Sequence, residues 1–194
     1  MKKTIVLLVL LCIGFASCDG RKSHNGSLSD SIKMFKKTVT IEMSSYTPET
    51  YVEQKVDTLL SNGFRVHIKT YSDMETNVVY SKIKDTINYK THYRNYKFDI
   101  RVEKNGKVVY NETFNKSRAN KILGFGDNFV TDSPLYNFNT LAVLKSIQIN
   151  DEPSLKNDVL IDIIYAIPET NRYSLHTLFI MENGKSNMVI VETK

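Results

Sequence analysis

The chain of 194 residues carries 26 basic and 21 acidic side chains, a formal charge of +5 at pH 7. It has two cysteines, Cys12 and Cys18, so residues 19–194 exclude disulfides, thiolate zinc sites and cysteine nucleophiles. The positive excess is local, because the stretch from Lys82 to Lys107 holds eight basic residues against three acidic ones. The length suits one domain with a sizeable buried core.

The N-terminus has the three-part plan of a secretory signal. Lys2 and Lys3 form a cationic start, Thr4 to Phe15 is almost continuously apolar, and the small residues Ala16 and Ser17 precede Cys18. The apolar segment falls short of the ~20 residues that a membrane-spanning helix needs. Residues 1–17 are therefore predicted to be a cleaved signal peptide.

The four residues Phe15-Ala16-Ser17-Cys18 resemble the lipobox of bacterial lipoproteins, with phenylalanine where leucine is commonest. The resemblance implies that Cys18 becomes the first residue of the mature chain and receives a thioether-linked diacylglycerol and an acyl chain on its amine. Two or more acyl chains hold a protein firmly on a membrane. The alternative is an ordinary secreted protein whose cysteine stands there by chance.

The segment after the cysteine indicates a linker followed by one domain. Residues 19–30, DGRKSHNGSLSD, lack apolar periodicity and predict a flexible tether, while SIKMFKKTVTIE predicts a short helical turn before a first strand near 38–42. We expect the lipidated cysteine and tether to cover residues 18–37 and a single β-rich domain to cover residues 38–194.

Period-two patterns then predict half-buried strands. Phe64, Val66 and Ile68 alternate with polar residues, and so do Phe98, Ile100 and Val102. The dipeptide Asn-Gly recurs at 62–63, 105–106 and 183–184, which predicts three hairpins. For the middle hairpin we expect a three-residue loop of residues 104–106, which would pair Ile100 with Tyr110 and Val102 with Val108.

Near the C-terminus, the apolar runs 159–167, 175–181 and 188–191 predict central strands covered on both faces. Residues 115–138 predict a long loop with a short helix near 117–123. The fold class expected is all-β, an antiparallel β-sandwich or open barrel of roughly eight to ten strands with at most one or two short helices.

Together with the lipobox, the segments SNGFRVHIKTYSD and VLIDIIYAIPET resemble small envelope lipoproteins of gut-dwelling anaerobes, from families of unknown function. The resemblance is loose, extends over most of the chain and includes no catalytic motif. It implies a place in the cell envelope and a single domain.

The sequence offers little support for catalysis or metal binding. The four histidines are scattered, and a calcium loop starting at Asp73 fails because Val78 and Lys84 stand where glycine and glutamate are required. Asp162 interrupts an apolar run and could be catalytic, although such a residue more often faces solvent or accepts hydrogen bonds. We predict no catalytic residue, metal or cofactor.

One segment suggests ligand binding. In INYKTHYRNYKFDIR, residues 87–101, tyrosines alternate with cations, and cations beside aromatic faces can bind anionic sugars or lipid head groups. The alternative is an exposed strand whose lysines keep its edge soluble. The candidate ligand-binding residues are Lys90, Tyr93, Arg94, Tyr96 and Lys97.

Two functions follow from these patterns. The first is a lipid-anchored, non-enzymatic binding or scaffolding module of the cell envelope, held on the membrane through its N-terminal lipid. Its partner would be an acidic glycan, a lipid head group or an envelope protein, and export disfavours nucleic acid. The second is an envelope or polysaccharide hydrolase with dispersed carboxylates, which requires two carboxylates that face one cleft.

Overall fold

The computed structural model describes residues 28–34, 41–150 and 157–194. Contacts divide the chain into two units, residues 1–41 with 84–87 and residues 42–83 with 88–194. In the first unit, residues 28–34 form a helix with exposed side chains, and the turn residues Asp85 and Thr86 have positive φ angles. Cys18 and most of the predicted tether lie outside the described residues.

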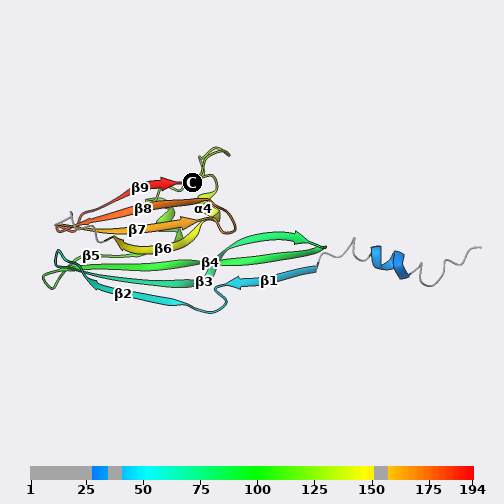
Figure 1. The fold of residues 1–194 in the computed structure, drawn as a ribbon, viewed down its shortest axis with the longest axis horizontal. Coiled ribbons are helices and arrows are strands. Elements are labelled where there is room, and N and C mark those ends of the chain that lie inside the picture. The colour runs from blue at the N-terminus through cyan, green and yellow to red at the C-terminus, as the bar shows by residue number, and fades with distance from the viewer. Residues whose placement is uncertain (1–27, 35–40, 151–156) are drawn as a thin grey trace, which may run out of the picture. The chain divides into compact units, whose positions relative to one another are not determined.

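Apart from the terminal strand residues Ile41, Lys84 and Ile87, the second unit contains two β-sheets, shown in Figure 1. The first has the order β1-β4-β3-β2, with β5 also paired to β4, and the second has the order β6-β7-β8-β9. The strands of the first sheet are β1 (Ile41–Thr47), β2 (Glu53–Leu59), β3 (Phe64–Lys84), β4 (Ile87–Lys104) and β5 (Lys107–Phe114). Those of the second are β6 (Val143–Asn150), β7 (Asp158–Ala166), β8 (Tyr173–Met181) and β9 (Ser186–Thr193).

A single buried cluster joins the two sheets. Phe64, Val66, Phe98 and Ile100 from the first sheet are at most 1% exposed, and they share this cluster with Ile161 and other residues of the second sheet. Alternation along each strand places these side chains on the inner face. The predicted all-β sandwich is therefore confirmed, as are the buried faces of β3 and β4.

All three Asn-Gly dipeptides lie in hairpin turns, but the register predicted for the middle hairpin is wrong. Lys104 pairs with Lys107, so the loop has two residues, Asn105 and Gly106, both with positive φ angles. A bulge then shifts the register so that Val102 faces Tyr110. The extra residue in β5 brings apolar side chains opposite one another, and Phe98 stacks on Phe114 with ring centroids 4.7 Å apart.

Near the C-terminus, the predicted central position is right for two runs and wrong for the third, and the outward residues Ile164 and Phe179 of the two central strands are only half-buried. β7 and β8 are central, and Val159, Ile163 and Ile180 are fully buried. β9 is instead an edge strand, and its residues Val189 and Ile190 are 41% and 50% exposed. A short apolar run does not distinguish an edge strand from a central one, because the order of strands depends on tertiary packing.

Two short helices lie between β5 and β6, namely α3 (Lys116–Ile122) and α4 (Phe138–Leu141), and the first matches the predicted helix. The side chain of Asn115 caps α3 by accepting a hydrogen bond from the Arg118 N–H. Ala119, on the inner side of α3, is buried in the core cluster. The segment thus covers part of the core.

Candidate ligand-binding cleft

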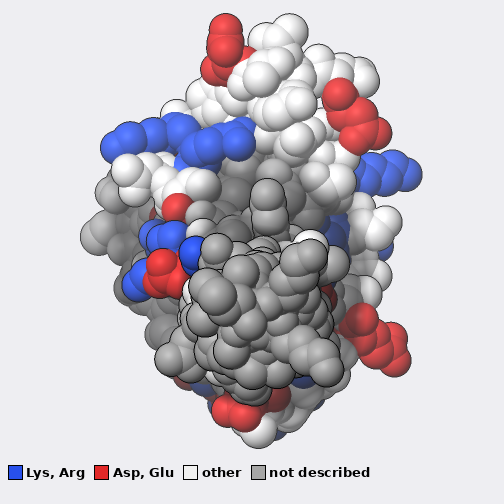
Figure 2. Space-filling view, turned by 90° about the vertical axis from the view of Figure 1, so that its right-hand side faces the viewer, with Lys and Arg blue, Asp and Glu red and all other residues white. Residues whose placement is uncertain are grey.

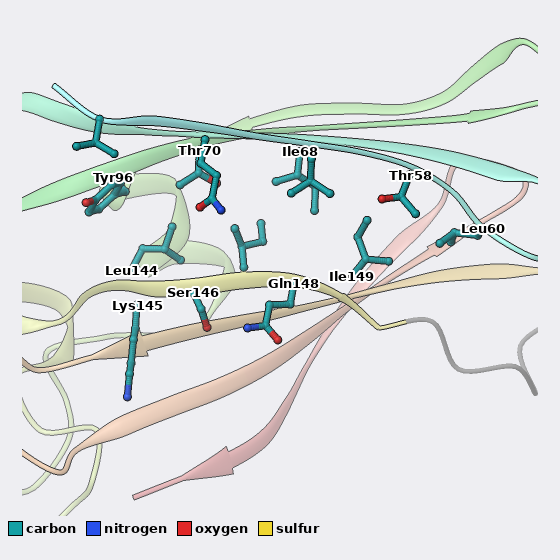
Figure 3. A pocket seen from close by; sticks show the side chains of 14 residues that line it. Thr58, Leu60, Ile68, Thr70, Tyr96, Leu144, Lys145, Ser146, Gln148 and Ile149 are labelled. Atoms are coloured by element: carbon teal, nitrogen blue, oxygen red, sulfur yellow. The ribbon is translucent and has the colours of Figure 1, made fainter.

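A cleft of about 660 Å³ opens between the two sheets, where the edge strand β2 of the first sheet lies near the edge strand β6 of the second. Figure 3 shows side chains from both sheets meeting across it. Its volume falls within the range of small-molecule sites in proteins.

The inward-facing lining of the cleft combines apolar side chains with neutral polar ones, among them Thr58 and Thr70. Figure 3 shows Leu144 and Ile149 pointing from β6 toward β2 and β3, whereas Lys145 and Gln148 point away. Among residues 28–34, 41–150 and 157–194, no aspartate or glutamate lines the cleft. The lining residues are Val52, Gln54, Val56, Thr58, Leu60, Ile68, Thr70, Tyr96, Leu144, Lys145, Ser146, Ile147, Gln148 and Ile149.

The wall formed by β2 follows from strand alternation. Val52, Val56 and Leu60 lie on the side that lines the cleft, and the charged residues Lys55 and Asp57 alternate with them. Val56 is 36% exposed and Val52 is 43% exposed, so this wall leaves apolar surface in contact with water.

The wall formed by β6 depends on a β-bulge. The β6–β7 register shifts between Leu144 and Ser146, which leaves Lys145 as the extra residue. Leu144 therefore faces the core before the bulge, and Ile147 and Ile149 pack against it after the bulge. Without this shift, one apolar set would point to the opposite face.

Hydrogen bonds fix both ends of the β2 wall. At its start, the Val52 N–H donates to Ser72 Oγ at 3.0 Å, and the Ser72 N–H donates to the Val52 carbonyl at 2.9 Å. At its end, Asn62 Nδ2 donates to the carbonyl of Asp158 on β7, 3.0 Å away. This last bond joins the two sheets next to the cleft.

The opposite side of the sandwich, where β5 and α3 approach β8 and β9, holds a smaller hollow of about 330 Å³. A Cβ atom on Gly184, in the β8–β9 turn, would lie 2.5 Å from the Val109 carbonyl oxygen of β5. Buried residues of α3 and of the segment after it, among them Leu123 and Phe125, belong to the core cluster. The cleft of about 660 Å³ therefore lies on the β2 and β6 side, and the smaller hollow on the β5 and β9 side.

The five predicted ligand-binding residues lie along β4 but do not converge. Lys90 pairs with Glu42 at 2.7 Å, and Arg94 stacks on Tyr46 at 4.5 Å while donating to two backbone carbonyls. Lys97 pairs with Asp73 at 3.3 Å, and the Tyr93 hydroxyl donates to Glu169. Tyr96 is the member of the set that lines the cleft. Their role as ligand contacts stays a prediction.

The charged surface is mixed. On the face shown in Figure 2, Lys and Arg side chains lie among Asp and Glu side chains. The hydrogen bond from Tyr93 to Glu169 raises the pKa of that tyrosine to about 12, so its hydroxyl stays protonated at neutral pH. In the basic stretch, Lys90 pairs with Glu42 and Lys97 pairs with Asp73, so contacts within the fold neutralise part of its positive charge.

Two acidic residues considered as catalytic or metal-binding candidates have structural partners. Asp162 accepts hydrogen bonds from Thr177 at 2.5 Å and from Asn150 at 3.0 Å, in line with the alternative that it is a hydrogen-bond acceptor. Asp73 accepts from Thr76 and from the Glu75 N–H instead of opening a calcium loop. Across the described parts of the chain, no group of three or more His, Cys, Asp or Glu residues is placed to hold a metal ion.

Sequence reasoning missed two buried basic groups and the cleft. Lys116 donates to the Phe138 carbonyl at 3.2 Å and to that of Ala142, and burial lowers its pKa to about 8. His176 is fully buried, and burial lowers its pKa to about 4. The cleft had a partial signal in the alternation of Val52, Val56 and Leu60 with charged residues, but not in the identity of the edge strands.

Comparison of the chain with protein-family models and with curated proteins finds no match. Within residues 28–34, 41–150 and 157–194, no helix has the length and apolar character needed to cross a bilayer.

Proposed function

We propose that this protein is a non-enzymatic binding module of the cell envelope, anchored by lipid at Cys18, whose ligand site is the cleft between β2 and β6. The observation that carries the proposal is the lining of the cleft, which joins apolar side chains of both sheets with a few neutral polar groups. Such a lining is typical of sites that bind apolar ligands and orient them with a small number of hydrogen bonds.

The same lining disfavours the hydrolase alternative. Glycoside hydrolysis requires two carboxyl groups on either side of the scissile bond. The carboxylates nearest in sequence to the β2 wall, Glu53 and Asp57, alternate with the lining residues and form surface ion pairs with Lys55 and Arg65. Binding without chemistry therefore fits the geometry better.

A neutral apolar fluorophore, N-phenyl-1-naphthylamine, tests the site in the full chain purified in a non-micellar amphipathic polymer. We expect its fluorescence to rise on binding to the native protein. Its apparent affinity for Val56→Asp should be at least ~10-fold lower, because a carboxylate in an apolar site must be desolvated. Leu59→Asp is the matched control, since Leu59 is 71% exposed and lies opposite Arg65. Equal affinities in the two variants would refute the cleft as the site.

A further inference from the structure

We infer that the cleft takes an extended peptide segment, which adds to the free edge of β2 as a further strand of the first sheet. The inference rests on the proposed function, because it names the class of ligand for the same cleft. It starts from the observation that an edge strand of each sheet, β2 and β6, borders the cleft, while β3 and β4 contribute Ile68, Thr70 and Tyr96.

The hydrogen bonds at the two ends of β2 show which backbone groups reach its free edge. The Ser72 N–H donates to the Val52 carbonyl, and the Leu60 N–H donates to the Phe64 carbonyl, so even-numbered residues of this strand bond to β3. In an antiparallel pair, the residues between them direct N–H and C=O the other way. The residues at the free edge are Glu53, Lys55, Asp57 and Leu59.

The β2 edge lacks the device that interrupts other edges of this fold. The β4–β5, β6–β7 and β8–β9 ladders each contain a register shift, whereas the seven β2–β3 pairs run without one. A bulge on an edge strand prevents it from acting as a template for another chain. Among the edge strands with a described register, β2 is thus the one with an uninterrupted edge.

The chemistry of the cleft distinguishes a peptide from an acyl chain. An acyl chain next to β2 would remove water from the edge N–H and C=O groups without bonding to them, which is unfavourable. A peptide strand bonds to those groups and turns alternate side chains inward over Leu144, Ile147 and Ile149. Since the described inward lining is uncharged and mostly apolar, we expect the inward side chains of the partner to be uncharged.

One substitution distinguishes a bound peptide from a bound acyl chain. Lys55 directs its N–H to the free edge, so Lys55→Pro removes one hydrogen-bond donor to the added strand, and the proline ring clashes with that strand. The hydrogen bonds between β2 and β3 and the lining of the cleft are kept. Lys55→Ala is the matched control, since it removes the same side chain and leaves the N–H.

The probe is a fluorescent peptide of about nine residues in which valine and threonine alternate between terminal lysines, used with the full chain. We expect it to bind the native protein and Lys55→Ala alike, to bind Lys55→Pro at least ~10-fold more weakly, and to slow amide exchange in residues 53–59. N-phenyl-1-naphthylamine should bind all three proteins equally, which also shows that Lys55→Pro is folded.

Other results overturn the inference. Binding of the naphthylamine without binding of the peptide, or equal peptide binding by Lys55→Pro and Lys55→Ala, would assign the cleft to small apolar ligands and leave the proposed function intact. Failure of both probes on the native protein would remove the proposed function as well. Dimers in sedimentation, with residues 53–59 already protected without peptide, would identify a second copy of the chain as the occupant.

Discussion

The hydroxyl of Ser174 lies 2.6 Å from Nε2 of His176 on the inner face of β8, and Nδ1 of His176 has no hydrogen-bond partner in the described part of the chain. The ring of Phe125 meets the imidazole of His176 edge-on, with ring centroids 5.3 Å apart, and the same Phe125 ring meets Tyr165 at 5.7 Å. An apolar enclosure favours the neutral imidazole over the charged one.

This enclosure predicts a loss of stability in mild acid. Burial lowers the pKa of His176 from 6.5 to about 4, so between these values the unfolded chain binds a proton that the native state excludes. The free energy of unfolding should be insensitive to His176 above pH 6.5 and should decrease as the pH falls from 6.5 to 4. Urea unfolding at pH 7.5, 6 and 5 measures this effect.

The control for this pH dependence is His67, which is partly exposed on β3. We expect His176→Gln to flatten the decline between pH 6.5 and pH 5, whatever its effect on stability at pH 7.5, and His67→Gln to keep the decline. The assignment to His176 is contradicted if both variants retain the native slope.

Lys97 is predicted to stabilise the fold through Asp73. Burial disfavours ionisation of Asp73, but hydrogen bonds from Thr76 and Glu75 and the ammonium of Lys97 outweigh it and lower the pKa from 3.8. Lys97→Gln should therefore reduce the free energy of unfolding by about 1 kcal/mol at pH 7, since it removes a charge-assisted hydrogen bond to a carboxylate that is 7% exposed.

The sign of the pH effect follows from the lowered pKa. The stabilisation by Lys97 is present above pH 3.8 and is lost as the pH falls below that value and Asp73 becomes protonated. Lys107→Gln, in the exposed β4–β5 hairpin, is the matched control and should change stability by less than ~0.5 kcal/mol. Equal urea midpoints for the two variants at pH 7 would show that the pair does not stabilise the fold.

Membrane attachment is predicted to depend on one sulfur atom. The lipobox resemblance places two or more acyl chains on Cys18, and each buried methylene contributes ~0.8 kcal/mol to membrane binding. Cys18→Ala should therefore move the chain from the membrane fraction to the soluble fraction after cell lysis. Cys12→Ala, within the predicted signal peptide, should leave the chain on the membrane. A Cys18→Ala protein that still sediments with membranes would exclude lipid at this residue as the anchor.

Local patterns in the sequence predict several of the strands, but neither the range of β2, nor β6, nor the arrangement of the strands. Alternation identified the buried faces of β3 and β4, and Asn-Gly located three turns, because both signals depend on neighbouring residues. The register of β4 and β5 was missed, since the bulge that brings Phe98 onto Phe114 is selected by packing between strands. The cleft was missed for a similar reason, because it requires the β2 edge and the β6 edge to meet on one side of the sandwich.

Two glycines in hairpin turns test the contact between the β8–β9 turn and β5. Gly184 and Gly106 have φ angles of +79° and +76°, so alanine at either site adopts an unfavourable backbone conformation, at a cost of about 1 kcal/mol. The surroundings differ, because a Cβ atom at Gly106 meets nothing within 4 Å, whereas one at Gly184 lies 2.5 Å from the backbone oxygen of Val109. Backbone atoms cannot move aside as a flexible side chain can.

We therefore expect Gly184→Ala to reduce the free energy of unfolding by at least ~1 kcal/mol more than Gly106→Ala, with the two compared by urea denaturation at pH 7. The shared backbone cost cancels between the variants, so the difference reports the contact between the β8–β9 turn and β5. Amide exchange near Val109 should also become faster in Gly184→Ala, because the turn has to move away from β5. If the two variants are equally stable, the close contact between the β8–β9 turn and the Val109 carbonyl of β5 is wrong.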